Sequence, residues 1–270
     1  MKHAFSERLQ TLRQQKSSVL CVGLDPDPER LPPHLVRSLP LPEAVSRFCR
    51  DIIEATAENA VAFKVNFAFF EALGANGYAV MEDVLSAIPP DVLTIADAKR
   101  GDIGNSASFY ARAVFDELRF DSITVSPYMG RDSVDPFMTR EGTCAFVLAR
   151  TSNPGSADFQ QLMIQDGPLF ETVAKRVVAW GEEANGEAGL VVGATDTRDL
   201  NTLRGLLPAT PFLIPGVGAQ GGSAEEVMEA SGSGPVLINS SRAIIYASSN
   251  EDFALAAGKA AASTRDRLGS

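Results

Sequence analysis

The chain has 270 residues, 45% of them hydrophobic, a length typical of one α/β barrel domain. Its formal net charge is −10 and it has no basic tract, which argues against nonspecific nucleic-acid binding. No apolar run approaches about 18 residues and the N-terminus has no apolar signal core, so we expect a cytoplasmic protein with no membrane partner.

Eight apolar segments are predicted to be strands, with helical segments between them. The predicted strands are 19–24, 61–65, 92–96, 122–125, 144–148, 189–192, 212–214 and 236–238. The predicted helices are 43–58, 78–87, 106–118, 168–183, 197–206, 224–229 and 252–268, with a weaker one at 134–139. This alternation predicts a single (β/α)8 barrel domain over residues 1–270, with a doubly wound sheet as the main alternative.

Three connections after strands are long: 26–42, 150–167 and 216–222. In a barrel, all three would lie at the C-terminal face, where active sites are built. We therefore expect the functional residues on this face, although each loop alone could be ordinary surface.

Cysteine and histidine chemistry is sparse in this chain. Cys21, Cys49 and Cys144 show neither metal-ligand spacing nor a disulfide framework. The only histidines, His3 and His34, are expected at the surface. Ser-His-Asp catalysis and His-rich zinc sites are therefore disfavoured.

Charged residues gather at the ends of the first three predicted strands. Residues 97–102 read Asp-Ala-Lys-Arg-Gly-Asp, and strand alternation predicts that Asp97 and Lys99 point to the same side. Asp102 falls just beyond this strand, while Asp25 and Lys64 lie at the two earlier strands. A set of carboxylates and ammoniums could hold charged lysines in a dry site, although an ion-paired strand end is the structural alternative. Lysine suits proton donation because its pKa responds to its surroundings.

A glycine loop follows the seventh predicted strand. Gly216, Gly218 and Gly221 match G-x-G-x-x-G, the pattern of a dinucleotide site. The loop comes late in the chain, however, and Arg242 rather than an acidic residue lies about 20 residues beyond it. Glycine loops near the last barrel strands commonly bind phosphate, and Arg242 could add a bidentate contact.

Together these residues resemble the orotidine 5′-phosphate decarboxylase family. The motif Asp97-x-Lys99-x-x-Asp102-Ile-Gly carries the resemblance, with Lys64 one strand earlier and Asp25 at the first strand end. Segments 152–155 (Ser-Asn-Pro-Gly) and 215–222, together with Arg242, add to it. Segment 63–70, Phe-Lys-Val-Asn-Phe-Ala-Phe-Phe, is similar to the bacterial branch with longer chains.

The resemblance implies a homodimer that converts orotidine 5′-monophosphate to UMP and CO2, the last step of de novo pyrimidine nucleotide synthesis, without metal or cofactor. It implies four catalytic residues, with Lys99 as proton donor to the C6 carbanion: Lys64, Asp97, Lys99 and Asp102. It implies these substrate-binding residues: Asp25, Ser106, Ser152, Gly218, Gln220, Ser241 and Arg242. Asp102 and Ser106 would reach into the partner's site, although the family usually has threonine at the position of Ser106.

Two other functions remain open at this point. The first is a Mg²⁺-dependent sugar-phosphate decarboxylase or aldolase on a related barrel, which would carry a metal-binding glutamate where Lys64 stands. The second is a barrel that binds nucleotides without catalysis.

Overall fold

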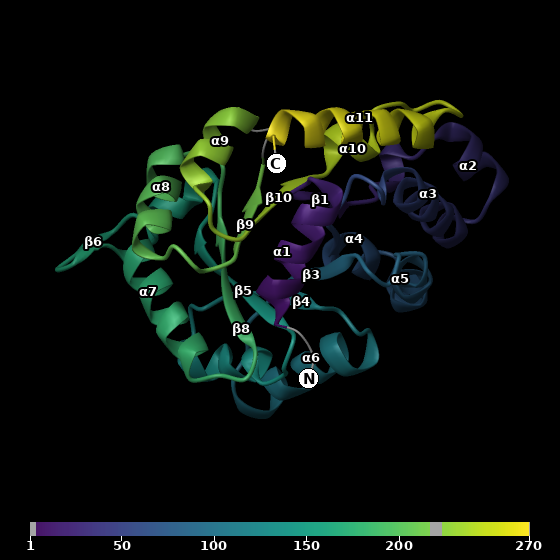
Figure 1. Cartoon of the computed structure of the whole chain (residues 1–270). Helices are drawn as coiled ribbons and strands as arrows, with labels where there is room; N and C mark the ends of the chain where they lie inside the picture. The colour runs from purple at the N-terminus through teal and green to yellow at the C-terminus, as the bar shows by residue number, and fades with distance from the viewer. Residues whose placement is uncertain (1–3, 217–222, 270) are drawn as a thin grey trace. The chain divides into compact units, whose positions relative to one another are not determined.

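The computed structural model describes residues 4–216 and 223–269 (Figure 1). Eight strands form a closed barrel in the order β1-β10-β9-β8-β5-β4-β3-β2, which confirms the predicted fold class. These strands are β1 (Leu20–Leu24), β2 (Ala62–Asn66), β3 (Leu93–Arg100), β4 (Ser122–Val125), β5 (Cys144–Arg150), β8 (Glu187–Val192), β9 (Phe212–Pro215) and β10 (Val236–Ser240). Each predicted strand overlaps one of them, because strands buried on both faces are nearly continuous apolar runs.

The chain divides into two compact units. The first comprises Met1–Thr11 and Lys99–Ile238, and the second comprises Leu12–Ala98 and Asn239–Ser270. The divisions fall within helix α1 (Phe5–Lys16) and strands β3 and β10.

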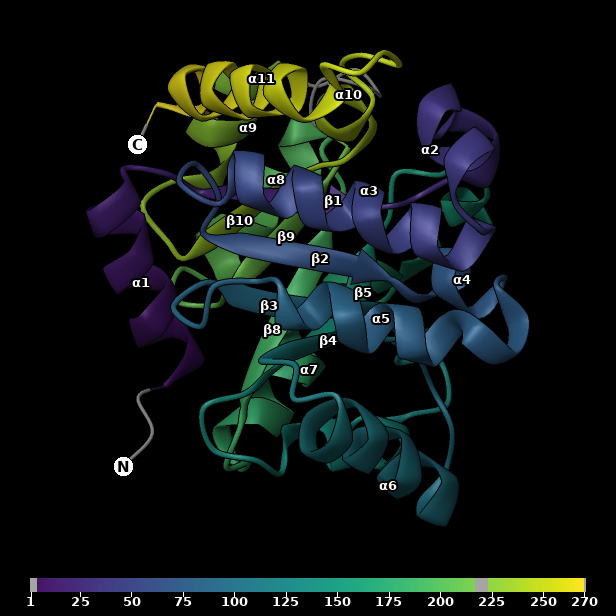
Figure 2. The ribbon, with the colours of Figure 1, turned by 90° about the vertical axis from the view of Figure 1, so that its right-hand side faces the viewer.

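The second unit holds β1, β2 and most of β3. Its helices are η1 (Pro28–Arg30), α2 (Pro33–Ser38), α3 (Leu41–Thr56), α4 (Phe67–Glu71), η2 (Gly74–Asn76), α5 (Gly77–Ser86), α10 (Arg242–Ile245) and α11 (Phe253–Leu268). Helix α3 lies between α11 and α5 (Figure 2) and buries one apolar stripe that includes Phe48 and Ile52. Gly258 of α11 allows this packing, because a Cβ there would lie 2.9 Å from the carbonyl oxygen of Ala55.

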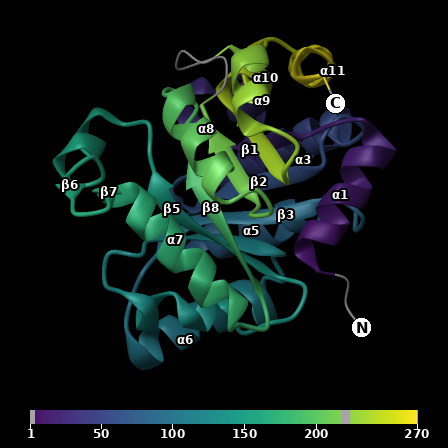
Figure 3. The same cartoon turned by 60° about the vertical axis from the view of Figure 1, so that its left-hand side comes forward.

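The first unit holds β4, β5, β8 and β9. Its helices are α6 (Gly104–Arg112) with its π-helical continuation η3 (Ala113–Glu117), η4 (Arg131–Ser133), η5 (Asp135–Met138), η6 (Pro154–Asp158), α7 (Leu169–Glu182), α8 (Thr197–Leu206) and α9 (Ala224–Ser231). Helices α8 and α9 pack side by side (Figure 1). A short antiparallel hairpin, β6 (Met163–Ile164) and β7 (Gly167–Pro168), leads into α7 (Figure 3).

Several predicted boundaries differ from the structure. The weak helix predicted at 134–139 is the short 3₁₀ helix η5, where Pro136 supplies no backbone donor. The loop predicted at 26–42 contains η1 and α2, and the loop at 150–167 contains η6 and the hairpin. Among the described residues, no helix is long and apolar enough to cross a membrane.

Candidate functional site

A buried cluster of charges lies in the second unit. The Lys64 ammonium donates a hydrogen bond to Asp97 Oδ2 at 2.7 Å and lies 3.6 Å from Asp25 Oδ1. The side chains of Lys64, Asp97 and Asp25 are 5%, 10% and 18% exposed. The parallel register places Lys64 opposite Gly23 on β1, two residues before Asp25. Three predicted site residues are thereby brought together at the carboxyl ends of adjacent strands.

The charge of Lys64 is stabilised by its neighbours. Burial alone would lower the pKa of this lysine, but the carboxylates of Asp25 and Asp97 outweigh burial and hold its pKa above the usual value. A buried ammonium paired in this way remains protonated at neutral pH. The cluster therefore presents one fixed positive charge flanked by two carboxylates.

Two buried acceptors beside this cluster have no hydrogen-bond donor among the described residues. They are Asp25 Oδ1 and Oδ1 of Asn239, a residue near the end of β10 that the sequence did not single out. A buried polar atom without a partner is costly, and a bound ligand commonly supplies the missing bond.

Tyr246 lies at the end of helix α10 and connects it to the end of β1. This tyrosine was not among the residues predicted from the sequence. Its hydroxyl donates to the Asp25 carbonyl oxygen at 2.9 Å and accepts from the Asp27 N–H at 2.6 Å. Its ring stacks on Phe48, and the Arg30 guanidinium lies 4.0 Å from the ring centroid. Burial raises the pKa of this tyrosine, so the hydroxyl keeps its proton as a donor.

The predicted phosphate contact, Arg242, is exposed at the start of α10. Ser241 precedes it, half-buried, and its Oγ accepts a hydrogen bond from Asn239 Nδ2 at 3.2 Å. Gly218 and Gln220 lie outside the described residues. Gly216 at the start of that loop has φ +95°, a conformation that favours glycine.

In the first unit, Lys99 has an unusual backbone. Its φ is +45°, which is rare for a residue with a side chain and marks a strained position. Its N–H donates to Thr124 Oγ1 at 2.9 Å, and its side chain is exposed. Simple strand alternation does not extend through such a residue, so the argument that alternation aligns Lys99 with Asp97 does not hold. Strained residues are concentrated at functional sites.

Asp102 and Ser106 lie near the start of α6. Asp102 is half-buried and accepts a hydrogen bond from the Ile103 N–H at 2.8 Å, while Ser106 is exposed. Large apolar side chains around them face solvent: Ile103 is 56%, Phe109 52% and Tyr110 40% exposed. This surface is suited to association because exposed apolar patches commonly mark interfaces.

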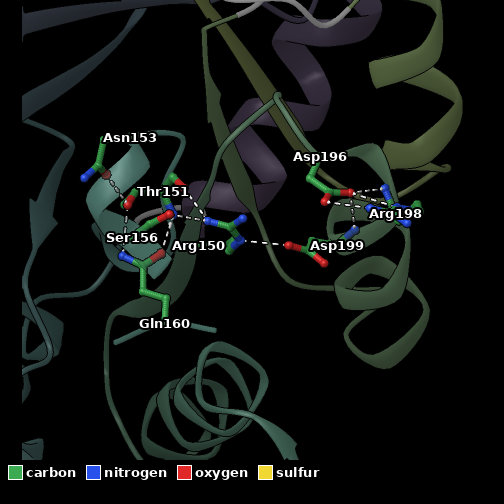
Figure 4. Close-up of polar contacts among 8 residues, drawn as sticks. All are labelled: Arg150, Thr151, Asn153, Ser156, Gln160, Asp196, Arg198 and Asp199. Atoms are coloured by element: carbon green, nitrogen blue, oxygen red, sulfur yellow. Dashed lines mark hydrogen bonds and ion pairs between the residues drawn. The ribbon is translucent and has the colours of Figure 1, made fainter. Parts of the chain in front are cut away.

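A network of polar side chains holds the loop that carries Ser152 (Figure 4). Arg150, at the end of β5, donates to Asp199 Oδ2, Ser156 Oγ and the Thr151 carbonyl oxygen, each at 2.7 Å. Gln160 pairs with the Thr151 backbone and hydroxyl. Arg150 is buried, so the hydrogen bonds of its guanidinium group hold the loop in place on both sides of Ser152.

Glycine allows a close approach of the backbone opposite Ser152. A Cβ at Gly193 would lie 3.0 Å from both the backbone nitrogen and Cβ of Ser152. Asp196, three residues later, caps α8 by accepting from the N–H groups of Arg198 and Asp199. The Arg150–Asp199 pair anchors the loop to the start of α8.

A cleft of about 1000 Å³ in the first unit contains none of the predicted site residues. It is lined by Arg8, Asp116, Asp121 and Arg140, among others. Arginine-aspartate pairs occupy it: Arg8 with Asp121, and Arg140 with Asp116. Its volume alone does not make it the functional site.

Comparison with known proteins identifies relatives along the whole chain. The sequence model described as "Orotidine 5'-phosphate decarboxylase / HUMPS family" matches residues 18–257. Orotidine 5'-phosphate decarboxylase of Dehalococcoides mccartyi is 46% identical over 271 residues, covering 98% of this chain and 97% of the relative.

Two solved structures share the fold. The OMP decarboxylase of Leishmania donovani has a TM-score of 0.81 at 37% identity, covering 98% of this chain and 99% of that one. A putative orotidine-monophosphate decarboxylase from Toxoplasma gondii has a TM-score of 0.85 at 36% identity, covering 98% of both chains.

Proposed function

The chain belongs to the orotidine 5′-phosphate decarboxylase / HUMPS family, it decarboxylates orotidine 5′-monophosphate to UMP and CO2 in pyrimidine biosynthesis, and we propose that Lys99 is the proton donor. The observation that carries the proposed site is the buried Lys64 ammonium held between Asp25 and Asp97. The metal-dependent alternative would need a metal-binding glutamate at the position of Lys64, where this buried ammonium would repel Mg²⁺.

The reaction needs a proton and a place for negative charge. The bond between C6 of the pyrimidine and its carboxylate breaks, its electron pair stays on C6, and CO2 leaves. Lys99 donates a proton to form the new C6–H bond and then regains one from solvent. One residue, Ala98, separates Lys99 from Asp97, so their Cα atoms are at most about 7 Å apart, which keeps both near the same reacting group.

Asp97 and Lys64 supply the electrostatic surroundings of the reaction. Asp97 lies beside the substrate carboxylate in this proposal, a contact between like charges that ends when CO2 leaves. Lys64 orients the Asp97 carboxylate through its 2.7 Å hydrogen bond. Groups held in place before the reaction need no reorganisation during it, which is how such a site lowers the barrier.

The remaining predicted residues bind the substrate. Asp25 and Lys64 contact the ribose, and Ser152 contacts the pyrimidine. Gln220, Gly218, Ser241 and Arg242 hold the phosphate. The Arg150 network supports the role of Ser152, because it orders the loop before the substrate arrives.

We further propose a homodimer in which Asp102 and Ser106 complete the partner's site. The exposed apolar residues Ile103, Phe109 and Tyr110 next to them support an interface on this part of the chain. The whole chain would form one barrel domain, since its relatives match it from end to end. A cytoplasmic location fits the three buried free thiols, which a reducing compartment would keep unpaired.

The test is an ultraviolet assay that follows loss of orotidine 5′-monophosphate in excess EDTA, with and without added Mg²⁺. We expect equal turnover in both conditions. Activity that disappears in EDTA and returns with Mg²⁺ would favour the metal-dependent sugar-phosphate chemistry. Binding of UMP without any turnover would favour a non-catalytic nucleotide-binding barrel.

A further inference from the structure

We propose that Asn239 is a further substrate-contacting residue, whose Oδ1 accepts a hydrogen bond from a ribose hydroxyl of the bound nucleotide. The inference rests on the proposed function and adds a residue to its binding site. It is carried by the burial of Asn239, its unpartnered acceptor and its position beside the charged cluster.

Asn239 is a buried polar residue whose side-chain oxygen lacks a hydrogen bond. It is 6% exposed, and its Nδ2 donates to Ser241 Oγ at 3.2 Å. Its Oδ1 is buried and accepts nothing from the residues that the structure describes. An unpaired buried amide oxygen costs about 1–3 kcal/mol, so a residue kept in this state is suited to a bond that forms on ligand binding.

Asn239 Oδ1 lies close to Gly23 of β1, next to the charged cluster. A Cβ at Gly23 would lie 1.9 Å from Ser241 Oγ and 3.1 Å from Asn239 Oδ1, so glycine allows both side chains to approach this strand. Lys64 lies opposite Gly23 on the other neighbouring strand. Asp25, two residues after Gly23, lies 3.6 Å from the Lys64 ammonium, and its Oδ1 likewise has no hydrogen-bond donor among the described residues.

Both acceptors need a hydrogen-bond donor, and this need indicates which part of the ligand contacts them. A phosphate dianion offers oxygen acceptors only, so it cannot satisfy Asn239 Oδ1. A ribose offers two adjacent hydroxyl groups, each with a donor proton. Asn239 Oδ1 on β10 and Asp25 Oδ1 just after β1 both have no hydrogen-bond donor among the described residues, and together they match such a pair of hydroxyls.

The test compares the affinities of UMP, 2′-deoxy-UMP and 3′-deoxy-UMP by calorimetry in the wild type and in Asn239→Leu, which keeps the volume and removes the amide. We expect Asn239→Leu to lose about tenfold in UMP affinity, the equivalent of about 1.4 kcal/mol. Affinity for one of the two deoxy analogues should stay unchanged, which also identifies the hydroxyl. The preference for UMP over that analogue is a ratio within one preparation, so partial unfolding does not alter it.

Two more variants sharpen the result. Asn239→Asp keeps an oxygen acceptor and should retain the preference for the hydroxyl. Ser240→Ala changes the buried neighbour on the opposite face of the strand and should leave all three affinities unchanged.

Equal losses for all three ligands in Asn239→Leu, or no loss at all, would overturn the inference while leaving the function intact. If the wild type neither binds UMP nor turns over orotidine 5′-monophosphate, the proposed function fails and the role of Asn239 fails with it.

Discussion

Replacing Lys64 with methionine tests whether the buried cluster depends on its single ammonium. Methionine keeps most of the aliphatic volume and removes the charge. In the native protein, Nζ lies 2.7 Å from Asp97 Oδ2 and 3.6 Å from Asp25 Oδ1. Its loss leaves two carboxylates close together and largely removed from water.

The expected cost follows from this geometry. Removing one partner of a buried ion pair typically costs about 3–5 kcal/mol. Asp25 retains 18% exposure and so keeps part of its hydration, which favours the lower end, about 3 kcal/mol. Since domains are usually stable by about 5–15 kcal/mol, Lys64→Met should still fold, but it should unfold at a clearly lower urea concentration.

Urea denaturation at pH 8 and at pH 5, at one fixed protein concentration, measures the effect. The pKa of Lys64 is raised in the folded protein, so its contribution is complete below its unfolded pKa of about 10.5 and unchanged between these two pH values. In Lys64→Met, the uncompensated carboxylates should have raised folded pKa values. The destabilisation caused by these two carboxylates is then largest at pH 8, and it decreases towards pH 5 as they become protonated.

A second substitution isolates the cause. Lys64→Met combined with Asp97→Asn removes one of the two opposing charges and should recover part of the lost stability. The reasoning would be refuted if Lys64→Met cost less than about 1 kcal/mol at both pH values, or if the double variant were less stable than the single one.

Three further predictions concern the reaction. Lys99→Ala should lower kcat by at least about 100-fold while leaving the Kd of UMP nearly unchanged, and near-normal kcat would remove this lysine from its role. Arg242→Ala should weaken substrate binding by about 2–3 kcal/mol, read from KM, whereas a substrate without phosphate should react equally with both proteins. Mixing inactive Lys99→Ala with inactive Asp102→Ala should restore about one quarter of wild-type activity after random subunit exchange, because half of the dimers then hold one intact site. No recovery in demonstrated heterodimers would mean that Asp102 acts within its own chain.

Much of the fold follows from local patterns. The eight strands were predicted within a few residues, since each is a short apolar run between polar loops. Helix α8 was predicted with its observed bounds, Thr197–Leu206. Short elements were missed: α2 and α4 have six and five residues, too few to show a helical period.

The candidate site was predictable as a set of residue types and much less so as geometry. Asp25, Lys64 and Asp97 were found because charges at the ends of apolar strands are conspicuous. Asn239 and Tyr246 were not found, because a single asparagine or tyrosine near a strand end carries no distinctive pattern. Their significance lies in an unpartnered oxygen and in two hydrogen bonds to the end of β1.

By itself, the sequence determined the order of strands and helices, the resulting fold class and the identity of the charged residues. These depend on periodicity and residue type, which act over a few neighbouring positions. Only the tertiary structure decided that Lys64 reaches both carboxylates, that Lys99 has a left-handed backbone and that Asn239 and Ser241 approach β1 at Gly23. These features depend on the register of adjacent strands and on contacts between residues far apart in the chain, which local sequence patterns do not encode.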